Sequence, residues 1–173
     1  MKTTQQWLTE VKADPAKLTQ WLERQYVGEA LAAERIQSLA DQTNTRSKKV
    51  LERIASDEQK HTKWVAELLV ARGIPLPELT YEGTRYWKPI LDNMHSFEEV
   101  AGVGHHAEAM RLVRIRALAV DPDIDADIRE VFTQILPDEE FHAKAFAAMS
   151  TPEAIENTRK LHEAGLELLG LEI

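Results

Sequence analysis

The feature that most constrains this chain is a short motif that occurs twice. The pattern Asp-Glu-x-x-His-x-Lys begins at Asp57 and again at Asp138, each time within a long segment in which apolar residues have helical spacing. On a helix, residues i and i+3 lie on one face about a turn apart, so each motif presents a carboxylate beside an imidazole. This combination of donors suits iron or manganese. The two pairs are Glu58 with His61, and Glu139 with His142.

A single glutamate precedes each motif in a second repeated segment. Glu29-Ala30 is followed by Arg35-Ile36, and Glu108-Ala109 is followed by Arg114-Ile115. The interval between these upstream glutamates is nearly the same as the interval between the motif glutamates. The pattern therefore indicates two helical hairpins related by duplication.

Capping signals predict where the helices begin and end. Asp14 before Pro15 is an N-cap followed by a first-turn proline, and Ser96 with Glu99 forms a capping box. In chain order we expect a short helix from about Thr4 to Lys12, one from Pro15 to a loop at 42–46, one from this loop to Gly73, one from Ser96 to Asp121, one opened by Asp121-Pro122-Asp123 that runs to about Met149, and one from about 152 to 170.

The expected fold class is all-α. The four main helices form two antiparallel hairpins of a four-helix bundle, with additional N- and C-terminal helices. The segment from Ile74 to His95 is the long crossover between the second and third main helices. Counted from the hairpin loops, the two single glutamates and the two carboxylate–imidazole pairs fall at one level of the bundle.

Composition excludes several classes of function. The net charge of -8 argues against nucleic acid as a partner, and no apolar run approaches the length of a membrane span. The sequence has no cysteine, which excludes disulfides and thiolate metal sites. The first seven residues lack the apolar core of a signal peptide, so we expect a cytoplasmic location.

A single glutamate on the first and third main helices, with ExxH on the second and fourth, resembles the ferritin-like di-iron carboxylate superfamily. The segment from Leu51 to His61 is rubrerythrin-like, and no rubredoxin domain is expected. The resemblance implies one ferritin-like domain over residues 1–173, with a bundle core at about 15–149 and a C-terminal helix at about 152–170. It also implies two iron ions, or manganese or a mixed pair, bound by Glu29, Glu58, His61, Glu108, Glu139 and His142.

The resemblance also implies a role for each residue. Glu58 and Glu139 resemble the carboxylates that bridge two metals, while Glu29 and Glu108 resemble terminal ligands. Four further residues are candidates for supporting roles. Asp57 is expected to bond His142 and Asp138 to bond His61, while Tyr26 and His105 are expected to bond a ligand or an oxygen species, or in the case of Tyr26 to fill the core.

One position departs from the rubrerythrin pattern. Rubrerythrins have an additional carboxylate one turn beyond the single glutamate of the third helix, where this chain has Arg111. The six-residue set is closer to bacterioferritin ferroxidase centres and to the di-iron hydroxylase of ubiquinone biosynthesis.

The expected function is that of a non-haem di-iron oxidoreductase reacting with O2 or peroxide, as an oxygenase, peroxidase or ferroxidase. An oxygenase also requires a small organic substrate and an electron donor. The alternatives are a ferritin-like iron-binding ferroxidase protein and a helical bundle with a structural metal only. The C-terminal helix either covers the bundle end or mediates a homodimer, through Leu161, Leu166, Leu168, Leu169 and Leu171.

Overall fold

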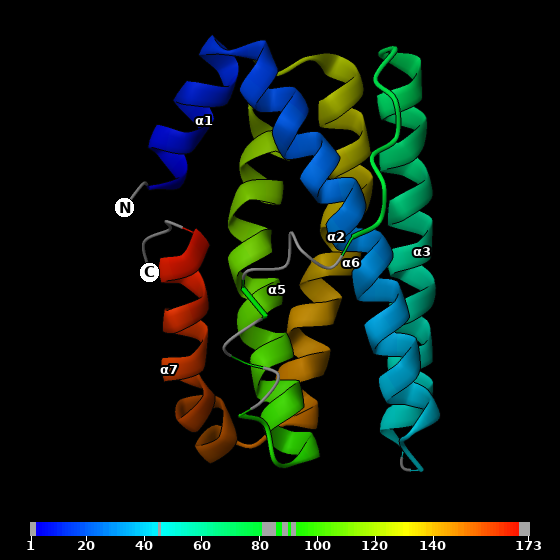
Figure 1. The fold of residues 1–173 in the computed structure, drawn as a ribbon, viewed down its shortest axis with the longest axis vertical. Coiled ribbons are helices and arrows are strands. Elements are labelled where there is room, and N and C mark those ends of the chain that lie inside the picture. Colours follow the sequence, from blue (N-terminus) through cyan, green and yellow to red (C-terminus); the bar gives the residue numbers. More distant parts are fainter. Residues whose placement is uncertain (1–2, 45, 81–85, 88–89, 91–92, 170–173) are drawn as a thin grey trace.

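A computed structural model describes residues 3–44, 46–80, 86–87, 90 and 93–169 of the chain. All regular elements within these residues are helices, which confirms the predicted all-α bundle (Figure 1). None of the described helices combines the length and hydrophobicity needed to cross a bilayer. The helices are α1 (Thr4–Ala13), α2 (Pro15–Asp41), α3 (Ser47–Ala71), α5 (Phe97–Val120), α6 (Ala126–Met149) and α7 (Pro152–Leu169).

The four long helices form two antiparallel hairpins. Helix α2 packs on α3, α5 packs on α6, and the hairpins meet chiefly where α3 contacts α6 (Figure 1). Helices α3 and α5 run in the same direction, so the chain must return along the bundle between them. Residues 74–80 run back beside the bundle as the predicted crossover requires, whereas much of the remaining crossover lies outside the described residues.

Side-chain caps set the helix starts largely as predicted. The Asp14 carboxylate accepts hydrogen bonds from the first backbone N–H groups of α2, and Ser96 Oγ accepts one from Glu99 N–H. The Glu99 carboxylate, however, accepts its bond from His95 N–H, one residue before the cap. Ser96 is therefore a true N-cap, but the reciprocal half of the predicted capping box is shifted by one residue.

The predicted start of α6 at the Asp121-Pro122-Asp123 signal is wrong. The side chain of Asp121 accepts a hydrogen bond from Asp123 N–H at 2.8 Å, which closes a turn of the kind that aspartate favours. Helix α6 begins only at Ala126. The Asp-Pro-Asp sequence thus forms the hairpin loop, and the helix starts after it.

Two apolar clusters divide the bundle core into an upper and a lower part. Each of the four long helices contributes apolar residues to both clusters. Its predicted metal-ligating residues lie between these two groups of apolar residues. The first cluster, which α1 helps to cover, includes Leu22, Val65, Leu69, Ile115 and Phe132. The second includes Ile36, Leu51, Ile54, Ala101 and Phe146. A polar layer is therefore held between two rigid apolar layers at mid-height.

Helix α7 lies along the side of α5 rather than across the end of the bundle (Figure 1). The helices approach closely at Gly102, where an added Cβ would lie 2.9 Å from Thr158 Oγ1. The alternative in which this helix covers the bundle end is therefore wrong. Leu168 and Leu169 are partly exposed, and Leu171 lies outside the described residues, so the homodimer stays a prediction.

Candidate metal centre

The central helices bring the six predicted ligands together in the polar layer. All six side chains are buried, with at most 4% of any residue exposed. Such burial is costly for carboxylates that lack compensating charges. The six residues are Glu29 on α2, Glu58 and His61 on α3, Glu108 on α5, and Glu139 and His142 on α6.

The donor atoms fall into two overlapping groups. In each group the candidate donor atoms lie within 4.8 Å of one another. Glu58 and Glu139 belong to both groups, whereas each of the other residues belongs to one. The two shared glutamates thus stand between two potential metal positions. One group adds Glu29 and His61, and the other adds Glu108 and His142.

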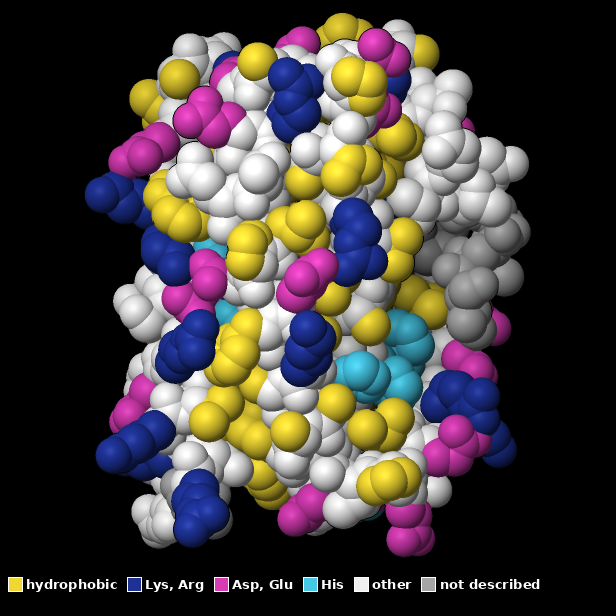
Figure 2. All heavy atoms as spheres, turned by 180° about the vertical axis from the view of Figure 1, so that it is seen from behind, with side chains coloured by type: hydrophobic (Ala, Val, Ile, Leu, Met, Phe, Trp, Pro, Cys, Tyr) yellow, Lys and Arg dark blue, Asp and Glu magenta, His cyan; other side chains and the backbone are white. Residues whose placement is uncertain are grey.

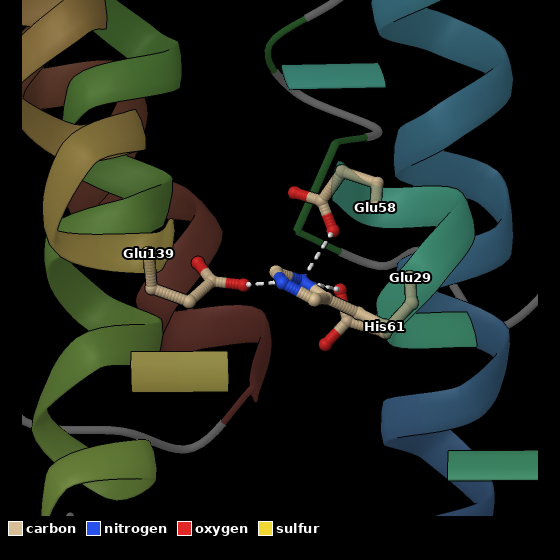
Figure 3. A group of neighbouring side chains, drawn as sticks. All are labelled: Glu29, Glu58, His61 and Glu139. Carbon is tan, nitrogen blue, oxygen red and sulfur yellow. Dashed lines mark ion pairs between the residues drawn. The ribbon is translucent and has the colours of Figure 1, made fainter. Parts of the chain in front are cut away.

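The imidazole of His61 points into the first group (Figure 3). Its Nδ1 lies 3.4 Å from Glu139 Oε1, 3.6 Å from Glu58 Oε2 and 3.9 Å from Glu29 Oε2. In the second group, His142 Nδ1 lies 3.5 Å from Glu58 Oε1 and 4.0 Å from Glu139 Oε2. Both rings therefore direct the same nitrogen at the two shared carboxylates.

The other nitrogen of each ring faces an aspartate of the opposite motif. His61 Nε2 lies 3.2 Å from Asp138 Oδ2, and His142 Nε2 makes a longer contact of 3.5 Å with Asp57 Oδ2. Lys60 Nζ joins the two aspartates, at 2.9 Å from Asp57 Oδ1 and 2.8 Å from Asp138 Oδ2. An Nε2–H bonded to a carboxylate leaves Nδ1 as the lone-pair donor, which is the tautomer that a metal requires.

Unpaired atoms reveal what the polar layer can bind. Among the described residues, the buried side-chain atoms without a hydrogen-bond partner are Nδ1 of His61 and His142 and Oε2 of Glu58 and Glu139. Buried polar atoms are nearly always paired, so four orphans within one cluster require an explanation. Imidazole nitrogens and carboxylate oxygens are donors for divalent iron or manganese. The residues present therefore fit two metal ions.

Arg111, whose contacts the sequence analysis did not predict, reaches into the same cluster. Its Nη2 bonds Glu29 and lies 3.2 Å from Glu139 Oε1, while Nη1 lies 3.4 Å from both Glu58 Oε1 and Glu108 Oε2. One guanidinium thus contacts all four carboxylates. The available signals were its i+3 spacing from Glu108 and its place where the rubrerythrin pattern has a carboxylate.

Gln25 is a further residue that sequence analysis missed. Its side-chain amide donates a hydrogen bond to Glu29 Oε1 from one helical turn before it. The i, i+4 spacing on α2 was the only signal in the sequence. Gln25 can therefore fix the orientation of the Glu29 carboxylate.

Burial and charge act in opposite directions on these groups. Burial raises the pKa of Glu29 and Glu108 well above the usual value, against the attraction of Arg111. Burial also acts to raise the pKa of Glu58 and Glu139, but Arg111 and the neighbouring glutamate and histidine side chains outweigh it and lower both values.

The balance is reversed for His61. Burial acts to lower its pKa, but contacts with Glu139 and Glu58 raise it to about 11. The metal-free site therefore carries protons that metal binding would displace.

The two remaining candidates make contacts outside the six-residue donor set. Tyr26 packs against the first apolar cluster. His105 Nδ1 lies 2.9 Å from the carbonyl oxygen of Ala143, to which it donates a hydrogen bond. The roles of Tyr26 and His105 toward a ligand or an oxygen species stay predictions.

Comparison with known proteins bears on the whole of this arrangement. Neither the search of curated proteins nor the search of solved structures gave a match. The sequence model of the rubrerythrin family matches residues 20–150, which include all six buried donors, both aspartates and Arg111. The chain therefore belongs to the rubrerythrin family, a family of ferritin-like di-iron carboxylate proteins.

Proposed function

We propose that this protein is a di-iron carboxylate oxidoreductase that reacts with O2 or peroxide at the buried cluster. The observation that carries the proposal is the inward direction of four unpaired donor atoms, two on shared glutamates and two on histidines of opposite hairpins. A cluster built only to hold the helices together would pair these atoms with one another or with Arg111.

The two overlapping donor groups support an assignment of bridging and terminal ligands. Glu58 and Glu139 would bridge the two ions because each belongs to both donor groups. Glu29 and Glu108 would be terminal carboxylates, and His61 and His142 would bind through Nδ1. With two iron ions bound, the centre supplies paired one-electron redox steps and open coordination positions.

The surrounding residues would orient the ligands and hold protons. Asp138 and Asp57 fix the His61 and His142 rings and keep their Nε2 atoms protonated. Lys60 holds the two aspartates at a fixed separation across the interface between the hairpins. The apolar clusters on both sides exclude water, which strengthens electrostatic interactions inside the centre.

Anaerobic metal loading followed by rapid mixing tests the proposal. Metal analysis should find about two iron or manganese ions per chain. The ferrous protein should then develop the near-ultraviolet absorption of ferric iron faster than ferrous iron in protein-free buffer, on mixing with O2 or with hydrogen peroxide. Faster reaction with peroxide indicates a peroxidase, and faster reaction with O2 an oxygenase or ferroxidase.

Two results would point to the alternatives. Iron uptake far above two ions per chain, together with a cage-sized particle in gel filtration, would favour iron storage. Metal binding without accelerated oxidation would leave a structural metal. The double variant His61→Ala, His142→Ala provides the control, because it removes one nitrogen donor from each donor group.

A further inference from the structure

A cavity adjoins the candidate metal centre. Its volume is about 470 Å³, within the range of small-molecule binding sites. Glu108 and Arg111 lie on its wall, so the cavity reaches the carboxylate cluster itself. Most of the remaining wall is apolar and includes Ile36, Leu39, Trp87, Met110 and Phe146.

The packing of the hairpins explains why this space exists. Helices α3 and α6 pack closely on each other, whereas α2 and α5 make little direct backbone contact. The residues that face the space are small at several positions. An added Cβ at Gly28 would meet nothing within 4 Å, so a larger side chain there would extend into open space. Gly28 lies on the cavity wall, next to Glu29.

Arg111 gives the cavity its chemical character once metal is bound. Two divalent ions match the four carboxylate charges of the cluster, so the guanidinium loses the counter-charges that it has in the metal-free site. A buried cation without a partner is strongly unfavourable, because its lost hydration is not compensated. Only 17% of the Arg111 side chain is exposed, so water compensates little of that loss.

Besides Arg111, the cavity wall carries Glu108, Glu34 and Arg35. Glu108 belongs to the donor set and would bind metal, and Glu34 is exposed. Arg35 lies with its guanidinium carbon 4.7 Å from the centre of the Trp87 ring, which adds a second positive charge to the wall.

We propose that this cavity binds a small organic anion with an apolar body and one carboxylate, which pairs with Arg111. The proposal rests on the proposed function, since it is the bound metal ions that release Arg111 from the glutamates. The apolar body lies between α2 and α5, and its carboxylate end lies next to the metal centre. Such an anion would be the substrate of an oxygenase reaction or a resident effector.

Calorimetric titration of octanoate into manganese-loaded and metal-free protein tests this inference. Manganese is used because it suits the same donors and allows binding to be measured apart from any reaction with iron. Octanol and octylamine are matched in length and lack the carboxylate. We expect the manganese-loaded protein to bind octanoate at least about 10-fold more tightly than either, and more tightly than the metal-free protein does.

Two variants locate the ligand. Gly28→Leu should weaken octanoate and octanol alike because the side chain fills the cavity, while Gly28→Ala is the matched control. Arg111→Gln should remove the preference for octanoate over octanol and leave octanol binding in place. A preference that survives Arg111→Gln would show that the carboxylate binds elsewhere, to the metal or to Arg35, and it would overturn the pairing with Arg111.

The remaining outcomes separate this inference from the proposed function. Equal affinity for octanoate and octanol in the manganese-loaded protein, or no binding of any of the three probes, overturns the inference whatever iron does with oxidants. Iron that binds but fails to react overturns only the oxidoreductase proposal. A protein that binds no manganese or iron overturns both.

Discussion

His61 Nε2 and Asp138 Oδ2 are 3.2 Å apart, although the two residues belong to different hairpins. The contact fixes the imidazole that directs its other nitrogen at Glu58 and Glu139. A hydrogen bond of this kind sets the tautomer of a metal-binding histidine and raises its basicity. The interface between the hairpins is therefore part of the candidate centre.

Asp138→Ala should weaken metal binding by about 10- to 100-fold while the helices stay folded, because the His61 ring loses its orientation. Metal titration, with circular dichroism as a check on folding, measures this. Glu140→Ala is the matched control, since this neighbouring carboxylate pairs with Arg116 outside the cluster. Equal metal affinity in wild type and Asp138→Ala would mean that the aspartate only supports Lys60.

Glu58→Ala and Glu108→Ala should differ in how many metal ions they release. Glu58 belongs to both donor groups, so its removal should reduce occupancy of both positions, whereas removal of Glu108 should affect one. Metal analysis after dialysis counts the ions per chain. Retention of two ions by Glu58→Ala would refute its assignment as a bridging ligand.

Histidine side chains gather in one place on the face of the molecule seen in Figure 2. His106 stacks on His162 with ring centres 4.9 Å apart, and the hydroxyl oxygen of Tyr86 lies within hydrogen-bond distance of His162 Nδ1, at 2.7 Å. Burial, together with smaller contributions from the nearby His106 and His105, lowers the pKa of His162 from 6.5 to about 4. His162 is therefore neutral in the folded protein at mildly acidic pH, where the unfolded chain would protonate it.

The stability of the metal-free protein should consequently depend on His162 between about pH 4 and 6.5. In this window the unfolded chain binds more protons at this residue, so its contribution to the free energy of unfolding rises with pH. Urea denaturation of wild type and His162→Gln across the window isolates that contribution. The free energy of unfolding of wild type, relative to that of His162→Gln, should rise with pH up to about 6.5 and then level off. A difference that is constant with pH would contradict the lowered pKa.

The sequence predicted which six side chains would meet at mid-bundle because each follows a helical period and because the motif is duplicated. Such signals are local, and the helices needed only to align to bring Glu29 and Glu139 to one level. No local signal of this kind predicts where the Arg111 side chain lies. A long, flexible side chain one turn beyond Glu108 can reach solvent or the cluster, and the choice depends on the space between α2 and α5.

Two other features escaped sequence analysis for similar reasons. Asp121 and Asp125 both resemble helix caps, and only the bond from Asp123 N–H to Asp121 shows which one lies in a turn. The side of the bundle on which α7 packs depends on the close approach at Gly102, and a lone glycine in a helical segment does not reveal its partner.

Arg111→Gln should raise the affinity for manganese and lower the stability of the metal-free protein. In the metal-free cluster the guanidinium neutralises part of the charge of four buried glutamates, so metal ions must compete with it. Removing one partner of a buried ion pair costs up to about 3–5 kcal/mol, and the raised pKa values of Glu29 and Glu108 let protons offset part of this loss.

We therefore expect a lower melting temperature without metal and at least about a 10-fold gain in manganese affinity, measured by thermal denaturation and by metal titration. Arg114→Gln is the matched control. This arginine lies one turn further along α5, and its guanidinium carbon is 5.0 Å from the centre of the Trp7 ring. If Arg111→Gln and Arg114→Gln bind manganese equally well, Arg111 does not compete with metal, and its contacts with the four glutamates serve the fold alone.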